Sequence, residues 1–219
     1  MPAVIFDLDG TLADTSGDLI AAANVCFRQM GMGDVLDPLG DAGVALRGGR
    51  MMLRTGLTRM NGDLGLIDTY YPVLLEAYAE AIDVHTELYP GAIEAVDELR
   101  DAGFGVGICT NKPEGLAETL MQRLGVLDRF QALVGADTLP VRKPDPAPLF
   151  EASRRTGHGK ADCILVGDSD TDRSTARAAG VPSVLVTFGP AGDDMAALEP
   201  EALLNSFADL PGLARQLLG

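Results

Sequence analysis

Short apolar runs alternate with amphipathic stretches along most of the chain. The apolar runs are mostly continuous, and Gly, Pro or Asp flanks them, which is typical of strands buried on both faces of a sheet. Five runs are predicted to be strands: residues 3–9, 104–110, 132–137, 163–169 and 183–189.

Amphipathic segments lie between these runs and predict helices. In residues 91–103, Ile93, Val96 and Leu99 share one helical face, and the segment ends at a glycine suited to a C-cap. Three further segments repeat the form: residues 114–125, 145–157 and 171–180. This alternation predicts an α/β fold, a doubly wound parallel sheet covered by helices on both faces.

The region after the first predicted strand breaks this alternation. Residues 17–83 contain no convincing strand pattern, only helical ones such as residues 17–31 and 67–82. We therefore predict a helical domain at 17–83, inserted into a core domain made of 1–16 and 84–219. Thr15–Gly17 and Val84–Tyr89 are its predicted hinges.

Composition narrows the classes of function. The 219 residues carry a formal net charge of −15, which repels nucleic acid and anionic membranes, so neither is an expected partner. No apolar run approaches the roughly 20 residues that span a bilayer. The three cysteines form no CxxC pair, so we expect reduced thiols, no catalytic role for them and a cytoplasmic location.

Acidic side chains lie at the ends of two of the predicted strands, 3–9 and 163–169. Asp7 and Asp9 come at the end of 3–9, and Asp168 and Asp172 directly after a later apolar run. Turn formation or helix capping can account for Asp9, Asp170 and Asp172, but not for Asp168, which directly follows the apolar run. Neither explains Asp7 inside an apolar strand, because a buried carboxylate needs a cation or hydrogen bonds to stay ionised.

Two further segments bring phosphate-binding chemistry to the same edge. Thr110 and Asn111 precede a predicted helix, where hydroxyl, amide and backbone N–H groups suit a phosphate, although both residues also cap helices. Lys143 lies in a proline-containing loop that fixes its direction, although a lone surface lysine is the commoner case. The carboxyl ends of parallel strands form one ligand-binding edge.

Together these segments predict a site for a divalent cation and a phosphate. Carboxylates that converge at one edge repel one another unless a cation neutralises them, and Mg²⁺ commonly bridges carboxylates to substrate phosphate. No Gly-x-x-x-x-Gly-Lys segment occurs, which excludes a P-loop enzyme.

The same residues resemble a known family. DLDGT at 7–11, CTNKP at 109–113, Lys143 and GDSDTD at 167–172 are similar to the four motifs of the haloacid dehalogenase-like (HAD) hydrolase superfamily. Within it, they look most like the phosphoglycolate phosphatase group, and the 17–83 insertion is similar to that group's C1 cap. The resemblance implies a Rossmann-like HAD core.

The resemblance also implies a mechanism. Asp7 would attack phosphorus to form an aspartyl-phosphate, and Asp9 would act as general acid and then base. Thr110, Asn111 and Lys143 would bind the phosphoryl group, with Lys143 also stabilising its charge in the transition state.

A magnesium site follows from the same resemblance. Mg²⁺ would bind Asp7, the backbone carbonyl of Asp9 and Asp168, with Asp172 nearby. Thr171 departs from the group's usual Asn, and we assign no role to Asp170.

Specificity would come from the inserted domain. Arg47, Arg50 and Arg54 fall at helical spacing on one face, where they could bind a second anionic group such as a carboxylate. A solvated face paired with surface acids is at least as good an interpretation. We expect a monomer or homodimer that hydrolyses a small phosphorylated metabolite, foremost 2-phosphoglycolate. The alternatives are a mutase of the β-phosphoglucomutase type and a receiver-like regulatory protein.

Overall fold

A computed structural model describes residues 2–157, 159, 162–190 and 192–219. The chain divides into two compact units, and we describe each by itself. The larger unit consists of Met1–Ala13 and Leu88–Gly219, and the smaller one is Asp14–Glu87. The predicted domain boundaries, 1–16 with 84–219 and 17–83, lie within a few residues of these limits.

The larger unit is built on a six-stranded sheet in the order β5-β4-β1-β6-β7-β8, and all of its pairings are parallel. Its strands are β1 Ala3–Phe6, β4 Gly105–Cys109, β5 Ala132–Val134, β6 Cys163–Gly167, β7 Ser183–Val186 and β8 Ala202–Leu204. The chain adds strands on one side of β1 and then crosses to the other side. Strand order therefore reverses beside β1, and such a switch point is where open α/β sheets bind ligands.

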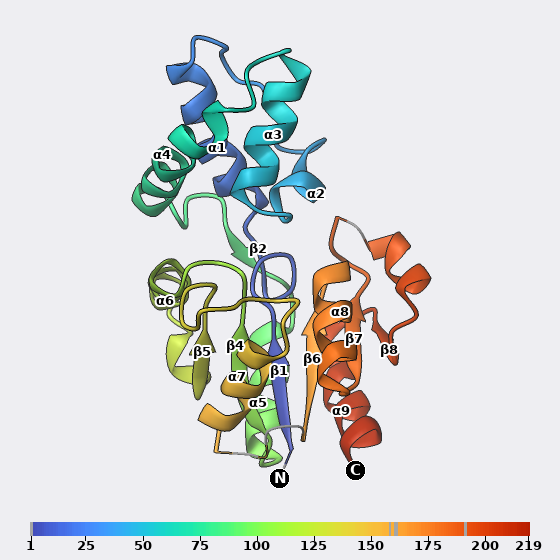
Figure 1. Cartoon of the computed structure of the whole chain (residues 1–219). Helices are drawn as coiled ribbons and strands as arrows, with labels where there is room; N and C mark the ends of the chain where they lie inside the picture. The colour runs from blue at the N-terminus through green and yellow to red at the C-terminus, as the bar shows by residue number, and fades with distance from the viewer. Residues whose placement is uncertain (1, 158, 160–161, 191) are drawn as a thin grey trace. The chain divides into compact units, whose positions relative to one another are not determined.

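Helices cover both faces of this sheet (Figure 1). α7 and α8 pack together on one face, α5 and α9 lie on the other, and α6 packs beside β5. Their bounds are α5 Ala92–Asp101, α6 Glu114–Arg123, α7 Ala147–Arg155, α8 Asp170–Ala179 and α9 Leu210–Leu218. Three short 3-10 helices complete the unit: Leu127–Arg129, Gly192–Leu198 and Phe207–Asp209.

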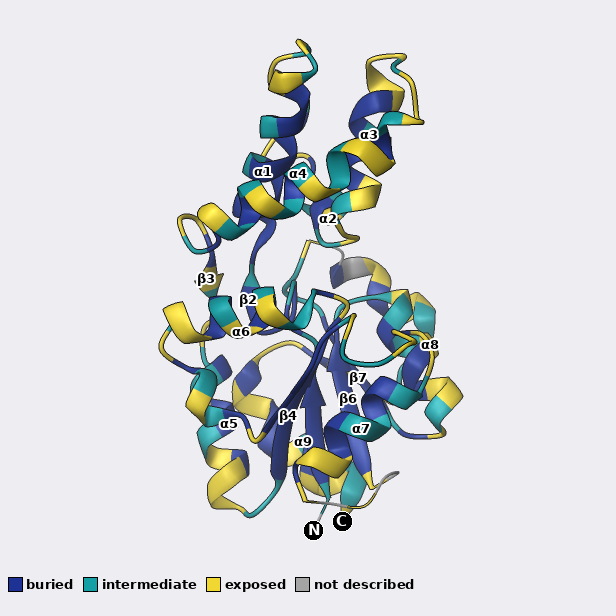
Figure 2. Cartoon of the chain, turned by 60° about the vertical axis from the view of Figure 1, so that its left-hand side comes forward, coloured by how far each residue is buried: buried dark blue, intermediate teal, exposed yellow. Residues whose placement is uncertain are grey.

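The sheet is the centre of the hydrophobic core. Every residue of β1 is buried, as are those of β4 and β6, which makes the dark band through the unit in Figure 2. Burial on both faces explains why these strands read as continuous apolar runs in the sequence. A doubly wound parallel sheet was predicted, and it is confirmed. β8 was missed, because it has only three residues, of which one is buried, and so carries little pattern.

The smaller unit contains only helices apart from the short strands at its ends. These are α1 Ser16–Gln29, α2 Ala42–Ala45, α3 Gly49–Arg59 and α4 Leu66–Glu80. The α1 and α3 helices approach closely at Gly56, where an added Cβ would come within 2.1 Å of the Phe27 ring. Two-residue strands, β2 Ala13–Asp14 and β3 Glu87–Leu88, pair where the chain passes from one unit to the other.

One buried side chain joins the two ends of the smaller unit. The Asp18 carboxylate accepts hydrogen bonds from the backbone N–H groups of His85 and Thr86, and from the Thr86 hydroxyl at 2.7 Å. Gly17 allows this approach, because a Cβ there would lie 2.8 Å from the Cβ of His85. The predicted hinge segments are therefore fastened to each other at this point.

Within the described residues, no helix combines the length and the apolar character needed to cross a membrane.

Candidate active site

Strand register brings the polar segments of the sequence together. Phe6 on β1 lies opposite Ile108 of β4 and Val166 of β6. The residues that follow these strands therefore meet at the carboxyl edge of the sheet, beside the switch point. The backbone N–H of Asp7 donates to the Val166 carbonyl at 2.8 Å, which fixes the start of this segment.

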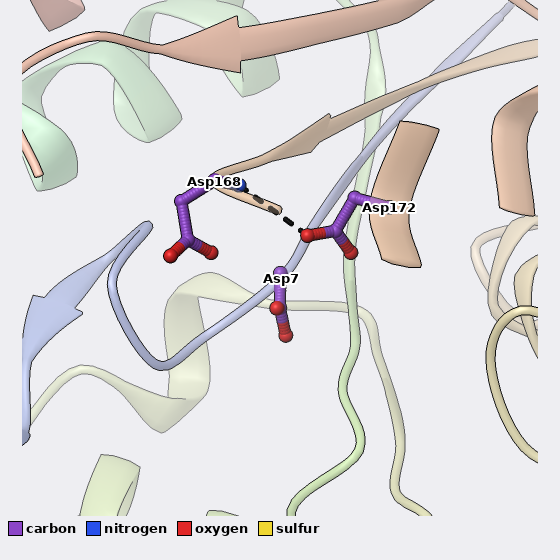
Figure 3. A group of neighbouring side chains, drawn as sticks. All are labelled: Asp7, Asp168 and Asp172. Atoms are coloured by element: carbon purple, nitrogen blue, oxygen red, sulfur yellow. Dashed lines mark hydrogen bonds between the residues drawn. The ribbon is translucent and has the colours of Figure 1, made fainter. Parts of the chain in front are cut away.

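Three carboxylates form the centre of the site (Figure 3). Asp7, Asp168 and Asp172 each offer an oxygen, and these oxygens all lie within 4.8 Å of one another. Asp172 is completely buried, and the Asp7 side chain is 13% exposed. Asp7 and Asp168 are both partly exposed, so a ligand can reach them, while Asp172 supports the cluster from within.

Crowding and burial change the protonation of this group. The pKa of Asp7 is raised to about 6, mainly by burial; Lys143 lowers it, and the carboxylates of Asp172 and Asp9 add to the rise. Burial, followed by repulsion from Asp172 and Asp7, also raises the pKa of Asp168 well above its ordinary value. The cluster therefore carries more negative charge than the protein alone neutralises, which is the condition that favours a bound cation.

Lys143 lies between two of the carboxylates. Its ammonium donates to Asp172 Oδ1 at 2.6 Å and lies 3.1 Å from Asp7 Oδ1, with the side chain 1% exposed. Burial alone would lower the pKa of Lys143, but Asp172 and Asp7 hold it above its ordinary value. This lysine is permanently charged beside Asp7, where it could stabilise the oxygens of a phosphoryl group.

Helix α8 begins inside the site and explains the position of Asp172. Ser169 is its N-cap, and the Ser169 hydroxyl both accepts from the Asp172 backbone N–H and donates to the Asp172 carboxylate. Gly167 is required beside it, because a Cβ there would lie 2.4 Å from Asp172 Cγ. Ser169 thus orients Asp172, while Asp170 is exposed at the first residue of the helix.

The two predicted phosphate-binding segments contact each other. Asn111 Nδ2 donates to the backbone carbonyl of Lys143 at 3.0 Å, so the Asn111 side chain positions the loop that carries the lysine. Thr110 is buried after β4, and its hydroxyl oxygen accepts from the backbone N–H of Lys112 at 3.2 Å. Both residues lie at the predicted edge, and their contact with phosphate stays a prediction.

The structure adds an ion pair that sequence reasoning missed. The Lys112 ammonium donates to Asp9 Oδ1 at 2.6 Å, with the lysine side chain 3% exposed and that of Asp9 17% exposed. The available signal was composition, because the chain has only three lysines: Lys112, Lys143 and Lys160. Lys160 lies outside the described residues. The other two both donate to carboxylates at this edge.

A second missed contact holds Asp168. The Thr11 hydroxyl, buried after β1, donates to Asp168 Oδ1 at 3.1 Å. This bond connects the first and fourth segments across the switch point. The threonine of the DLDGT sequence therefore has a definite task, which is to orient one carboxylate of the cluster.

The arginines lie in the smaller unit, and one part of their prediction is wrong. Arg47 is in the turn before α3, because Gly48 with φ of 94° separates it from the helix, so it does not share a helical face with Arg50 and Arg54. Arg50 pairs with Asp68 at 2.6 Å and stacks over the Tyr71 ring at 4.6 Å. For Arg50 the alternative interpretation, a surface ion pair, describes what is observed.

The donor set fits a hard divalent cation. Mg²⁺ prefers oxygen ligands, and the three neighbouring carboxylates at the carboxyl edge of the sheet supply them. The chain turns just after Asp9: Gly10 adopts a φ of 81°, and its N–H donates to the Ala13 carbonyl. Asp7 and Asp168 would hold the cation, with Asp172 behind them.

Comparison with known proteins agrees with this arrangement. Residues 4–186 match the family model described as haloacid dehalogenase-like hydrolase. The chain belongs to this family. The family model covers both the sheet strands that carry the site and the inserted helical unit.

Curated HAD relatives span nearly the whole chain. A phosphoglycolate phosphatase from Mesorhizobium japonicum is 36% identical, covering 94% of this chain and 91% of its own. Another from Rhodospirillum rubrum is 38% identical, covering 95% and 88%. The crystal structure of a predicted phosphoglycolate phosphatase from Haemophilus somnus covers 97% of both chains with a TM-score of 0.85 and 23% identity, which shows a shared fold.

Proposed function

We propose that this HAD hydrolase is a Mg²⁺-dependent phosphatase that hydrolyses 2-phosphoglycolate through a phosphorylated Asp7. The observation that supports it best is the position of Asp7, which is partly exposed, lies beside two further carboxylates and is 3.1 Å from a permanently charged lysine. The names of the relatives favour the substrate, since proteins named phosphoglycolate phosphatase are 36–38% identical over most of the chain.

The first half-reaction uses Asp7 and Asp9. A carboxylate oxygen of Asp7 attacks phosphorus, and the bond from phosphorus to the ester oxygen breaks. Asp9, two residues further along the same segment, gives a proton to the departing alkoxide. Lys143 donates hydrogen bonds to the phosphoryl oxygens as their charge develops, with Thr110 beside it.

The second half-reaction returns the enzyme to its starting state. Asp9 takes a proton from water as the water oxygen attacks phosphorus, the bond from Asp7 to phosphorus breaks, and phosphate leaves. Mg²⁺ bound by Asp7 and Asp168 would supply positive charge against the phosphoryl oxygens in both steps. Asp172 keeps Lys143 in place throughout, through their 2.6 Å ion pair.

A turnover assay tests the proposal directly. Phosphate release from 2-phosphoglycolate is measured with Mg²⁺ and with chelator, for the wild type, Asp7→Asn and Asp170→Asn. We expect release only with the metal, complete loss in Asp7→Asn, and near-normal rates in Asp170→Asn, because Asp170 makes the same charge change on the exposed face of α8. Release that survives in Asp7→Asn would rule out this nucleophile.

Trapping identifies the intermediate. After acid quenching with ³²P-labelled substrate, we expect label on the wild-type protein and none on Asp7→Asn, because the variant lacks the carboxylate that accepts the phosphoryl group. Label that stays on the protein without turnover would instead favour the receiver-like alternative. Transfer of label to a sugar phosphate would favour the mutase.

A further inference from the structure

Lys112 and Asp9 lie opposite each other at the ends of neighbouring strands. Phe6 of β1 pairs with Ile108 of β4, so the segments that follow these strands leave the sheet side by side. The Lys112 ammonium reaches Asp9 Oδ1 at 2.6 Å, with 3% of the lysine side chain and 17% of the aspartate side chain exposed. A lysine is seldom buried to this degree without an acidic partner, so this contact is a built feature of the catalytic edge.

The free energy of unfolding does not by itself explain this pair. Taking an ammonium and a carboxylate out of water costs desolvation energy, and packed apolar side chains of similar size often stabilise a protein as well or better. A buried ion pair can, however, select one side-chain geometry among several. Lys112 therefore suits a role in which the Asp9 carboxylate has to be held in one place.

The segment that carries Lys112 is itself held on both sides. The backbone N–H of Lys112 donates to the Thr110 hydroxyl oxygen at 3.2 Å, and its carbonyl accepts from the Ala136 N–H at 2.9 Å. Two residues later, where α6 begins, the Glu114 N–H donates to Asp137 Oδ1 at 2.7 Å. These bonds join the segment to the end of β4 and to the residues that follow β5, so the ammonium extends from a fixed backbone.

Asp9 has a task that depends on its position. A general acid must lie within about 2.6–3.2 Å of the oxygen that receives its proton. The Asp9 side chain leaves the chain just before the turn at Gly10, and rotation between staggered χ1 positions would carry its carboxylate away from such an oxygen. A misplacement of about 1 Å can cost about 100-fold in rate, so a contact that fixes this carboxylate has a catalytic consequence.

We propose that Lys112 is a positioning residue for Asp9 and holds its carboxylate where the leaving group takes up the proton. The inference rests on the proposed phosphatase function and adds a residue to its mechanism. A carboxylate has two oxygens, so Lys112 can hold Oδ1 while Oδ2 carries the proton to the leaving oxygen. Lys143 has a different task, since its ammonium contacts Asp7 and Asp172 on the side of the nucleophile.

The proton transfer also gains from the charge of Lys112. As the bond from phosphorus to the ester oxygen breaks, the electron pair on that oxygen takes the proton from Oδ2 of Asp9. Asp9 is then a carboxylate, and the ammonium 2.6 Å from its Oδ1 stabilises the negative charge that forms. Lys112 thus acts only through Asp9 and needs no contact with the substrate.

Two substrates separate this role from a general effect on the site. The alkoxide that leaves 2-phosphoglycolate needs a proton, whereas the acetate that leaves acetyl phosphate is a stable anion and needs none. Steady-state kcat/KM is measured on both, because it reports the first half-reaction and includes no step after the leaving group departs.

Five proteins are compared on these substrates. They are the wild type, Lys112→Met, Asp9→Asn, the double variant of these two and, as a control for loss of one positive charge, Arg177→Met on the exposed face of α8. Thermal melts check the fold, and Lys112→Gln replaces Lys112→Met if the latter does not fold.

For Lys112→Met we expect kcat/KM on 2-phosphoglycolate to fall about 30-fold or more, which is part of the roughly 10²–10⁴-fold that general acid catalysis contributes. On acetyl phosphate it should change less than about 5-fold. Added to Asp9→Asn, the lysine substitution should cost less than about 5-fold more on either substrate, because a residue that acts through Asp9 then has no acid to position. Arg177→Met should leave both values unchanged.

The remaining outcomes separate this inference from the function on which it rests. No loss in Lys112→Met, equal losses on both substrates, or a full further loss in the double variant would overturn the role of Lys112 alone. Equal losses on both substrates in Asp9→Asn would overturn the proposed general acid, and the role of Lys112 with it. Absence of wild-type release from 2-phosphoglycolate would overturn both the proposed function and this inference.

Discussion

Replacing Asp7 by Asn is expected to make the metal-free protein more stable, although it destroys the proposed nucleophile. Burial raises the pKa of Asp7 from its ordinary 3.8 to about 6, in a side chain that is 13% exposed. Each pKa unit is worth about 1.4 kcal/mol, so at neutral pH the ionised carboxylate costs the folded state about 3 kcal/mol. Asn keeps the shape of the protonated acid and removes this cost.

The sign of the pH dependence follows from the direction of the shift. The folded pKa of about 6 lies above the unfolded value of 3.8, so between these values the folded state holds a proton that the unfolded state has lost. Wild-type stability therefore falls, relative to the variant, as pH rises through this window. Below it the two proteins should differ little, and above it the full difference of about 3 kcal/mol should be present.

Thermal unfolding in the presence of chelator measures the effect. For a chain of this size, about 3 kcal/mol corresponds to roughly 6–12 °C in Tm. Asp170→Asn is the matched control, because it makes the same substitution at an exposed residue, the first of α8. Its Tm should change by no more than a degree or two, since exposed substitutions stay within about 0.5 kcal/mol.

Adding Mg²⁺ should reverse the order of the two proteins. A ligand that binds only the folded state raises Tm, and the wild type retains the Asp7 carboxylate that the variant lacks. The result that would refute this reasoning is a lower Tm for Asp7→Asn in chelator. The attraction between Asp7 and Lys143, 3.1 Å apart, would then outweigh burial and repulsion.

Three further outcomes are expected. Gly56→Ala should lower the free energy of unfolding by about 1–3 kcal/mol in urea, because its Cβ would lie 2.1 Å from the Phe27 ring, despite alanine's better helix propensity. Gly167→Ala should lower kcat/KM at least about 100-fold with an unchanged circular dichroism spectrum, since its Cβ would lie 2.4 Å from Asp172 Cγ and displace it. All three cysteines are buried, and burial raises the pKa of Cys109 to about 12, so iodoacetamide at about pH 8 should alkylate them only in denaturant.

Each of these outcomes has its own check. Gly115→Ala is the control for Gly56→Ala, because a Cβ at that helical glycine meets nothing within 4 Å, and it should not destabilise. A normal rate for Gly167→Ala would mean that Asp172 can move without loss. Rapid alkylation of the native protein would show that the core opens locally, and mass spectrometry of the labelled peptides would say where.

The sheet and the acidic cluster could be predicted because both follow from the pattern of apolar and polar residues along the sequence. Burial on both faces leaves a continuous apolar run, and this signal located β1, β4 and β6. Once the strands were parallel, Asp7 and Asp168 had to meet at one edge. The approach of their oxygens to within 4.8 Å follows from that topology.

Side-chain partnerships were the part that pattern could not supply. A lysine beside a proline looks the same whether it faces solvent or a carboxylate, so the pair between Lys112 and Asp9 was missed. Helical spacing likewise extended the arginine face to Arg47, because a period of three to four residues does not register the backbone break at Gly48. The contact between Lys112 and Asp9 joins residues that are 103 positions apart, and no local sequence window contains both.

The bonds of Asp18 have a consequence for how this chain can be altered. Because the Asp18 carboxylate ties the start of α1 to Thr86, the two ends of the helical insertion are held side by side by bonds within the insertion itself. A different helical segment, with its ends held together in the same way, could therefore replace residues 14–87 without disturbing the strand order. Such an exchange would leave Asp7, Asp168 and Asp172 where they are, because all three lie on the sheet unit.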